Sequence, residues 1–132
     1  MKHLEVVAGI ICYGEEILCM QRPMGKHEYT SLKYEFPGGK IEIGESNVEA
    51  LKRELIEEME MKVEVDESKK FLIVNHTYPD FELTMHSYIC NVDSKKFVMK
   101  EHNNFKWLKR EELSQLDWAT ADIPIMEKLM KI

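Results

Sequence analysis

The sequence predicts an α/β (α+β) fold in which one mixed β-sheet is sandwiched between α-helices. The chain has 132 residues, about the length of one domain, and its 44% hydrophobic and 32% charged residues are typical of a globular protein. Short β-rich segments bounded by turn residues are followed by segments with helical periodicity. Because no Pro/Gly/Ser linker or repeat interrupts the chain, we expect residues 1–132 to form a single domain.

In the first half, strands are expected at residues 6–12 and 17–20, joined by a turn at residues 13–16. Residues 23–33 are polar and predict a loop, and a short strand ending at residues 34–36 runs into a turn at Pro37-Gly38-Gly39. Ser46 and Glu49 have the spacing of a capping box, and no helix breaker follows before Met59. A helix is therefore predicted over residues 47–59.

In the second half, residues 71–78 and 83–92 are β-rich and predict a hairpin that turns at residues 79–81. A further short strand is expected at residues 105–108. Helices are predicted over residues 109–116 and 123–132, the second introduced by Asp122 as N-cap and by Pro124 in its first turn.

The net charge of −6 argues against long nucleic acid or an anionic membrane surface as the main partner. A polyanionic ligand would need positive charge from another source. The three cysteines (Cys12, Cys19 and Cys90) show no metal-site spacing and predict free thiols in a reducing compartment. With no signal pattern and no long apolar run, we expect a cytoplasmic protein that is a monomer, with a dimer as the alternative.

The predicted helix over residues 47–59 carries an acidic triplet beside its apolar stripe. Glu54, Glu57 and Glu58 are spaced i, i+3 and i+4, so their carboxylates share one arc and repel one another. One interpretation is a solvated face. The other is a site for a hard divalent cation such as Mg²⁺, which oxygen ligands suit. In that case Arg53, four residues before Glu57, would hold a carboxylate in place, and the Gly38-Gly39 turn would supply a backbone carbonyl.

The spacing around this triplet resembles the Nudix box, G-x5-E-x7-R-E-U-x-E-E-x-G-U, where U is a bulky aliphatic residue. Gly39 to Glu45 and Arg53 to Met61 match every fixed position except the last glycine, which is Glu60 here. A glycine at that position normally ends the helix in the left-handed conformation, so Glu60 leaves the geometry of the helix end open.

Further segments extend the resemblance over nearly the whole chain. Residues 34–40 resemble the strand and turn before the box in MutT-type members. Residues 100–102, followed by Trp107, resemble the loop that brings a further metal-associated glutamate. Residues 121–125 resemble the base-recognition segment of the CTP pyrophosphohydrolase branch.

The resemblance implies a Mg²⁺-dependent hydrolase, with Mn²⁺ as an alternative ion, that cleaves a nucleoside triphosphate to the monophosphate and pyrophosphate. It implies that Glu54, Glu57, Glu58 and Glu101, with the carbonyl of Gly38, hold the metal. Glu45 would be an auxiliary ligand or orient the water, and Arg53 would position carboxylates. The general base is Glu54 or Glu101, with Glu54 preferred.

Phosphates would contact Arg22 and Lys40. Asp122 has two competing roles, as helix N-cap or as reader of an exocyclic amine such as that of cytosine. Tyr34 and Tyr78 would stack on a base, with packing in the core as the alternative. Two other functions stay open: 8-oxo-dGTP hydrolysis in nucleotide-pool sanitation, and a non-catalytic Nudix module that senses nucleotides.

Overall fold

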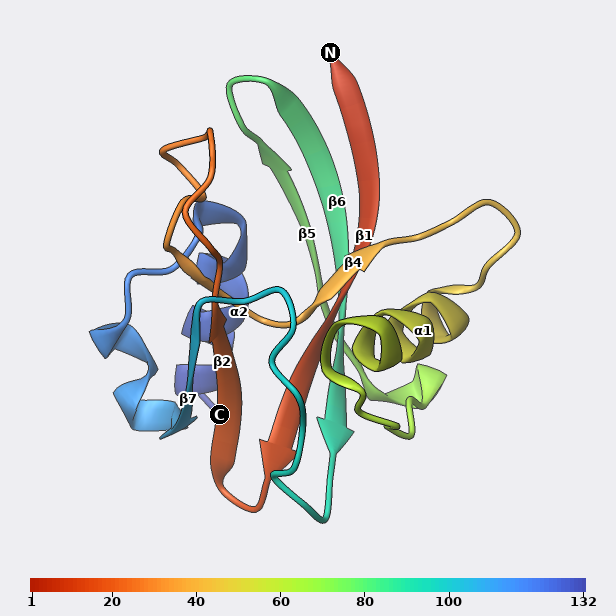
Figure 1. Cartoon of the computed structure of the whole chain (residues 1–132), viewed down its shortest axis with the longest axis vertical. Helices are drawn as coiled ribbons and strands as arrows, with labels where there is room; N and C mark the ends of the chain where they lie inside the picture. Colours follow the sequence, from red (N-terminus) through yellow and green to blue (C-terminus); the bar gives the residue numbers. More distant parts are fainter.

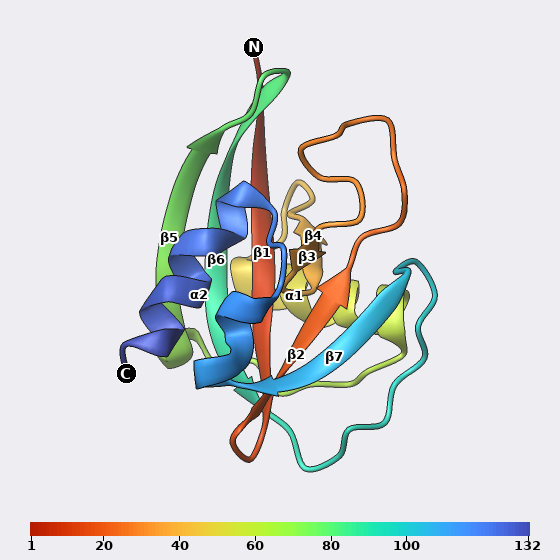
Figure 2. The ribbon, with the colours of Figure 1, turned by 90° about the vertical axis from the view of Figure 1, so that its left-hand side faces the viewer.

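The computed structural model describes residues 1–132, which form a seven-stranded sheet with helical elements on both faces (Figures 1 and 2). The strands are β1 (Lys2–Tyr13), β2 (Glu16–Gln21), β3 (Tyr34–Glu35), β4 (Gly38–Lys40), β5 (Lys70–Thr77), β6 (Phe81–Asn91) and β7 (Asn104–Lys109). The α-helices are α1 (Asn47–Met59) and α2 (Ile123–Met130). Three short 3₁₀ helices complete the fold: η1 (Glu67–Lys69), η2 (Arg110–Gln115) and η3 (Thr120–Asp122).

The sheet is mixed, as predicted. Its main path runs β3-β2-β1-β6-β5, with β4 added to β1 and β7 added to β2. Only β1 and β6 are parallel, and they pair along their whole length, from Lys2 opposite Phe81 to Cys12 opposite Asn91. A parallel pair needs a long crossover, which the chain between β1 and β6, including α1, provides. The predicted hairpin of β5 and β6 is confirmed as an antiparallel pair.

Each face of the sheet has its own apolar core. Because side chains alternate along a strand, β1 sends Val7 and Ile11 to one face and Ala8 and Ile10 to the other. The first pair packs with the predicted apolar stripe of α1, whose buried members are Leu51, Leu55 and Met59. The second pair packs with Trp118, Ile125 and Leu129. Helix α1 thus covers this face of the sheet, and its acidic residues are not members of that core.

Three predicted elements differ from the structure. The expected turn at Gly38-Gly39 is instead strand β4, paired antiparallel with β1. A Cβ at Gly38 would overlap the Val7 carbonyl, so only a glycine lets the backbone lie this close to β1. The helix expected over residues 109–116 is the 3₁₀ helix η2, and α2 ends at Met130 instead of Ile132. Neither α1 nor α2 has the length and apolar character needed to span a lipid bilayer.

Both ends of α1 are well defined. The capping box is confirmed: the Glu49 N–H donates to Ser46 Oγ at 3.1 Å, and the Ser46 N–H donates to Glu49 Oε1 at 2.9 Å. At the other end Glu60 adopts the left-handed conformation, with φ 50° and ψ 37°, and its N–H donates to the Ile56 carbonyl at 2.9 Å. The helix therefore ends with the geometry that a glycine usually supplies, at a cost of about 1 kcal/mol for a residue with a side chain.

Candidate active site

Arg53 is the centre of the acidic cluster on α1. Its Nε donates to Glu45 Oε2 at 2.6 Å, and its Nη2 donates to Glu45 Oε1 and to the Lys40 carbonyl, both at 2.9 Å. Its Nη1 donates to Glu54 at 2.9 Å and to Glu57 at 3.0 Å. One guanidinium thus fixes three carboxylates of the cluster and the end of β4. The contact with Arg53 lowers the pKa of the Glu45 carboxyl, while Glu45, followed by Glu54, raises the pKa of Arg53.

Glu58 is the one acid of the triplet that Arg53 does not contact. Its Oε2 atom is buried and has no hydrogen-bond partner. Burial, followed by the neighbouring carboxylate of Glu54, raises the pKa of Glu58 to about 9. Glu35 and Glu101 add to this shift, which means that their negative charges also face Glu58.

Gly39 gives the Glu54 carboxyl group the space that it occupies beside β4. The carboxyl group of Glu54 lies where a Cβ of residue 39 would stand, so a side chain there would collide with it. Glu54 can therefore press against the backbone of β4 only because residue 39 is a glycine. This contact brings the α1 acids next to the Gly38-Gly39 backbone, as expected from the sequence.

The four acids predicted to hold the metal lie together in one open groove, whereas Gly38 lines only the adjacent cavity. Its wall includes Glu54, Glu57, Glu58 and Glu101 from the acids and Gly39 and Lys40 from β4. No group of three or more His, Cys, Asp or Glu side chains is already spaced to hold an ion, because Glu54 and Glu57 contact Arg53 instead. The donor set nevertheless fits a hard divalent cation, since it is made of carboxylates and Glu58 Oε2 is buried without a partner.

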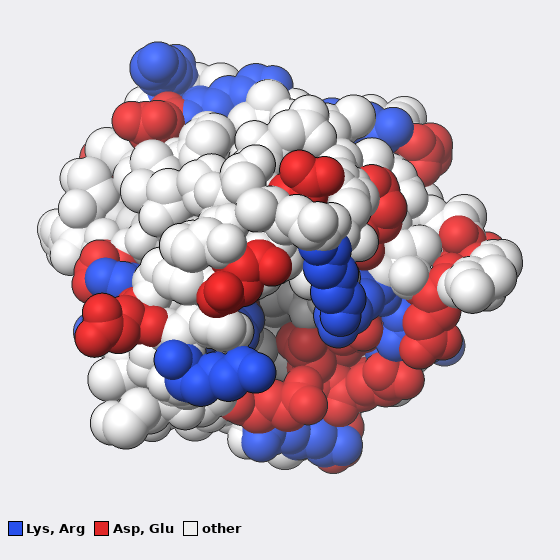
Figure 3. Space-filling view, turned by 90° about the horizontal axis from the view of Figure 1, so that it is seen from above, with Lys and Arg blue, Asp and Glu red and all other residues white.

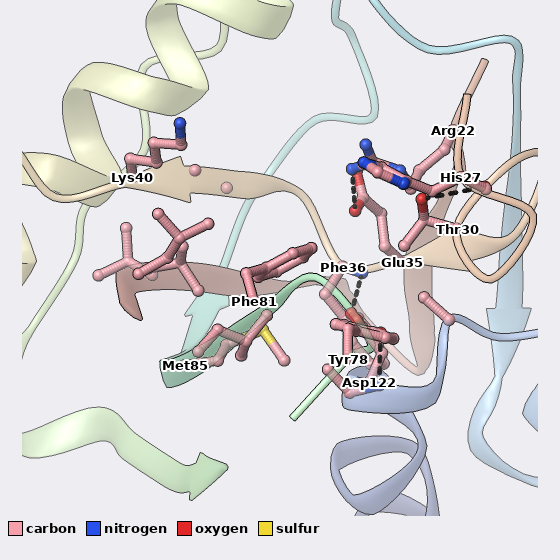
Figure 4. Close-up of a pocket in the computed structure, with 18 of the residues that line it drawn as sticks. Arg22, His27, Thr30, Glu35, Phe36, Lys40, Tyr78, Phe81, Met85 and Asp122 are labelled. Carbon is pink, nitrogen blue, oxygen red and sulfur yellow. Dashed lines mark hydrogen bonds and ion pairs between the residues drawn. The ribbon is translucent and has the colours of Figure 1, made fainter. Parts of the chain in front are cut away.

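A cavity of about 350 Å³ opens beside the acidic groove. Its apolar wall comes from β1 and β6 and includes Leu4, Val6, Leu83 and Met85. Lys40 lies at one end, and Asp122 and Tyr78 lie at the other (Figure 4). On the surface, a hollow is flanked by acidic side chains on one side and by basic side chains at its rim (Figure 3).

The cavity and the groove are continuous, because three residues line both. These are Gly39, Lys40 and Glu58. The cavity has the size of small-molecule sites, and it combines an apolar wall with a few polar groups. A ligand with a flat apolar part and an anionic part would therefore place the first in the cavity and the second in the groove.

Of the two roles that the sequence left open for Asp122, the structure does not show the capping role. Asp122 precedes α2 at the N-cap position, but its side chain makes no capping hydrogen bond. Instead Oδ2 accepts from the Phe36 N–H at 2.9 Å, and the residue lines the cavity with only 5% of its surface exposed. Burial, with a smaller contribution from Glu35, raises the pKa of Asp122 well above its usual value. The carboxyl is therefore neutral at a pH where an exposed aspartate is charged.

The two tyrosines predicted to stack on a base lie in different places. Tyr78 lines the cavity, where its Oη accepts from the Ala121 N–H at 2.9 Å and its ring stacks on Tyr29 with centroids 4.8 Å apart. Tyr34 does not reach the cavity, which corrects its assignment to the base site. It is buried in the core with its ring edge against Trp118, because β3 is held against the segment between η2 and η3 by the hydrogen bonds of Tyr34 with Asp117 and Ala119.

Arg22 and Lys40 both line the cavity, as the phosphate-binding prediction requires. Arg22 is paired with Glu35, from Nη1 to Oε1 at 3.1 Å, which the sequence prediction missed (Figure 4). The second Glu35 oxygen is 2.9 Å from His102 Nε2, and the His102 side chain is almost fully buried. A charged residue between the buried residues Tyr34 and Phe36 was the available indication that Glu35 belongs to a site.

Comparison with known proteins agrees with this geometry. Residues 6–128 match the family model described as NUDIX domain. The chain is 35% identical to the CTP pyrophosphohydrolase of Escherichia coli (strain K12), over 100% of this chain and 95% of that protein. It is 30% identical to the 8-oxo-dGTP diphosphatase of the same organism, with both chains fully covered. The solution structure of the E. coli ORF135 protein superimposes with a TM-score of 0.84 at 32% identity, covering 99% of this chain and 91% of that one.

The family model covers nearly the whole chain, and both E. coli relatives align with this chain over its full length. Gly39, Glu45, Arg53 and the acids Glu54, Glu57 and Glu58, which the structure brings together, are residues of the Nudix box. The chain belongs to the Nudix family of hydrolases.

Proposed function

We propose that this chain is a Mg²⁺-dependent nucleoside triphosphate pyrophosphohydrolase that converts CTP, dCTP or modified deoxynucleoside triphosphates to the monophosphate and pyrophosphate. The observation that carries the proposal is the continuity of the cavity with the acidic groove through Gly39, Lys40 and Glu58. A nucleobase in the cavity would lead its phosphates into the groove. The relatives named for CTP and 8-oxo-dGTP hydrolysis support the same substrate class.

The metal would be held by Glu54, Glu57, Glu58 and Glu101, with the carbonyl of Gly38 completing the set. Held there, Mg²⁺, or Mn²⁺ in its place, would supply positive charge to the phosphates and make the attacking water more acidic. It would also reverse the local negative charge that otherwise repels a triphosphate. Arg53 keeps Glu45, Glu54 and Glu57 beside the groove, and Glu54 and Glu57 would turn from the guanidinium toward the ion when it binds.

The remaining roles concern the substrate and the attacking water. Glu54, which lies against β4, is the preferred base for taking the proton of the water that attacks the β-phosphorus. Lys40 lines both the cavity and the groove, where its side chain would contact phosphate oxygens. Arg22 lines the cavity only and would have to leave Glu35 to reach a phosphate. Hydrolysis of this kind needs charge neutralisation and positioning more than covalent help from the protein.

Asp122 would read the base in its neutral form. A protonated carboxyl offers one acceptor and one donor side by side, and the amidine edge of cytosine offers the matching donor at N4 and acceptor at N3. The same pair fits a guanine oxidised at C8, which carries a hydrogen on N7 beside the acceptor O6. The raised pKa of Asp122 therefore favours cytosine and 8-oxoguanine nucleotides alike, and 8-oxo-dGTP hydrolysis is the second candidate function.

A kinetic panel with CTP, dCTP, 5-methyl-dCTP, 8-oxo-dGTP and the unmodified triphosphates tests the proposal. Pyrophosphate and nucleoside monophosphate should form only with Mg²⁺ or Mn²⁺, and the substrate with the highest kcat/KM decides between the two candidates. Glu57→Gln should reduce turnover by orders of magnitude with the fold intact, because a neutral amide is a poor substitute for an anionic ligand. Absence of turnover on every substrate would instead favour the non-catalytic sensing module.

A further inference from the structure

The proposed ligand Glu101 lies in the segment between β6 and β7, outside any helix or strand. This segment passes between β7 and α1 (Figure 1). Two backbone hydrogen bonds tie it down: the Val98 N–H donates to the Met59 carbonyl at 2.9 Å, and the Asn103 N–H donates to the Gln21 carbonyl at 2.8 Å. The position of Glu101 therefore depends on contacts that its neighbours make.

Both residues adjacent to Glu101 contact carboxylates of fixed elements. Before it, Lys100 Nζ lies 3.0 Å from Glu60 Oε2 at the end of α1. After it, His102 Nε2 lies 2.9 Å from Glu35 Oε2 in β3, and the His102 side chain is only 5% exposed. Glu101 is thus held from one side by the helix that carries the other acids and from the other side by the wall of the cavity.

Glu60 is the residue that stands in place of the expected Nudix-box glycine. A glycine would adopt φ 50° without strain, whereas Glu60 adopts it with strain. The side chain that causes this strain makes the pair with Lys100, whose members are 55% and 44% exposed. Because exposed ion pairs stabilise proteins little, stability alone does not account for a strained glutamate at the end of α1.

We propose that Glu60 is a positioning residue for metal binding: through Lys100 it holds Glu101 against the α1 acids Glu54, Glu57 and Glu58. The inference rests on the proposed function, because it requires Glu101 to be a metal ligand. The tie through Val98 and Met59 acts on the same stretch of chain and from the same end of α1. Through its pair with Lys100, Glu60 then links the position of Glu101 to that of α1, which carries the other proposed ligands.

Glu60→Gly tests this, because it removes the strain and the ion pair together. We expect the melting temperature to stay the same or to rise, while the Mg²⁺ concentration for half-maximal activity rises about two- to fivefold. In the metal-free protein the Val98 amide should exchange its hydrogen faster, since the segment is freed from the helix end. A Mn²⁺ titration followed by electron paramagnetic resonance, without substrate, should show the same weakening. A purely structural role would move stability and metal binding in the same direction.

Matched variants isolate the ion pair. Lys100→Met should reproduce the shift in metal requirement, and the exchange of charges in Glu60→Lys with Lys100→Glu should restore the wild-type value. Glu64→Gln is the control, because Glu64 is an exposed acid just beyond α1 without a hydrogen bond or ion pair. It should leave the metal requirement unchanged.

A Glu101→Gln background separates this inference from the proposed function. Glu101→Gln should raise the Mg²⁺ requirement, and Glu60→Gly should add nothing further in that background. If Glu101→Gln is impaired but Glu60→Gly binds Mn²⁺ and protects the Val98 amide like the wild type, the positioning role is overturned alone. If Glu101→Gln itself binds metal normally, the assignment of Glu101 as a ligand fails, and the role of Glu60 fails with it.

Discussion

Arg53 donates a hydrogen bond to each carboxylate oxygen of Glu45, from Nε to Oε2 at 2.6 Å and from Nη2 to Oε1 at 2.9 Å. The planar guanidinium also has donors left for Glu54, Glu57 and the Lys40 carbonyl. A lysine has one ammonium group and cannot reproduce this fork. The geometry of the acidic groove is therefore sensitive to a change that conserves charge.

Arg53→Lys should lower turnover about 10- to 100-fold, because the carboxylates would lose the partner that orients them. Steady-state kinetics at saturating Mg²⁺ measures the loss, and circular dichroism checks that the fold is intact. Lys52→Ala is the control on the same helix, since Lys52 is exposed and makes no ion pair. Equal turnover in Arg53→Lys and wild type would show that the fork is dispensable.

The adjacent glycines of β4 should respond differently to alanine. At Gly39 the new Cβ meets the carboxyl end of Glu54, which can move aside, whereas at Gly38 it meets the Val7 backbone, which cannot. Gly39→Ala should therefore keep its stability and lose about a hundredfold in turnover. Gly38→Ala should lose about 1–3 kcal/mol of unfolding free energy. Urea denaturation and kinetics on both variants check this, and the reverse pattern would contradict the structure.

Metal binding should release a proton at neutral pH. Glu58 has a pKa of about 9 in the metal-free protein, and a carboxyl must be ionised to hold a cation. Isothermal titration in two buffers of different ionisation enthalpy counts the protons released, and Mg²⁺ affinity should rise with pH up to about 9. In Glu58→Gln, binding should be weaker and this pH dependence should be lost. A proton count of zero for the wild type at pH 7 would oppose a protonated Glu58.

Asp122→Ala should change the ranking of substrates more than it changes the rate on a poor one. The carboxyl lines the cavity and makes no cap for α2, so its removal affects base contacts first. Asp122→Asn keeps an acceptor for the Phe36 N–H and separates that hydrogen bond from base reading. Ratios of kcat/KM across the nucleotide panel measure the effect. A uniform loss for all bases in both variants would assign Asp122 a structural role.

Asp122 should also make the protein less stable as the pH rises. Its pKa is raised in the folded state, so below the ordinary carboxyl pKa both states are protonated and nothing is lost. Above the ordinary carboxyl pKa the unfolded chain has released the proton while the folded protein still holds it, so the free energy of unfolding falls as the pH rises. The loss is complete once the pH has passed the raised folded-state pKa. Asp122→Asn lacks this loss, so its advantage in unfolding free energy over wild type should be larger at pH 8 than at pH 4. Urea denaturation at the two pH values measures it, and an advantage independent of pH would contradict the shift.

The α1 half of the site could be predicted because its information is local. Helical periodicity and the capping box place Glu54, Glu57 and Glu58 on one side of a helix, and the box spacing adds Arg53. The residues that line the cavity could not be predicted in this way, because they come together only through the pairing of strands that are distant in the sequence. Glu35 and His102 approach each other only because β3 and β7 both pair with β2.

Tyr34 and Gly38 show the same limit in detail. An aromatic residue in a short strand can face either the core or an opening, and pairing of β3 with β2 decided this for Tyr34. The glycines before the box predict close approach, but the approached group, the Val7 backbone, lies more than thirty residues away in the sequence. The residue types at positions 34 and 38 therefore predicted a buried or close contact, but the partner in each contact depends on strand pairing that is distant in the sequence.

The parallel pairing of β1 with β6 has a consequence for how the protein is made. Leu4 and Leu83 are register partners and both line the cavity, so the pocket needs the first strand and a strand translated about eighty residues later. A ribosome must release most of the chain before this site exists. Until β6 emerges, β1 has a free edge in the nascent polypeptide, which is the stage at which aggregation or chaperone capture would compete with folding.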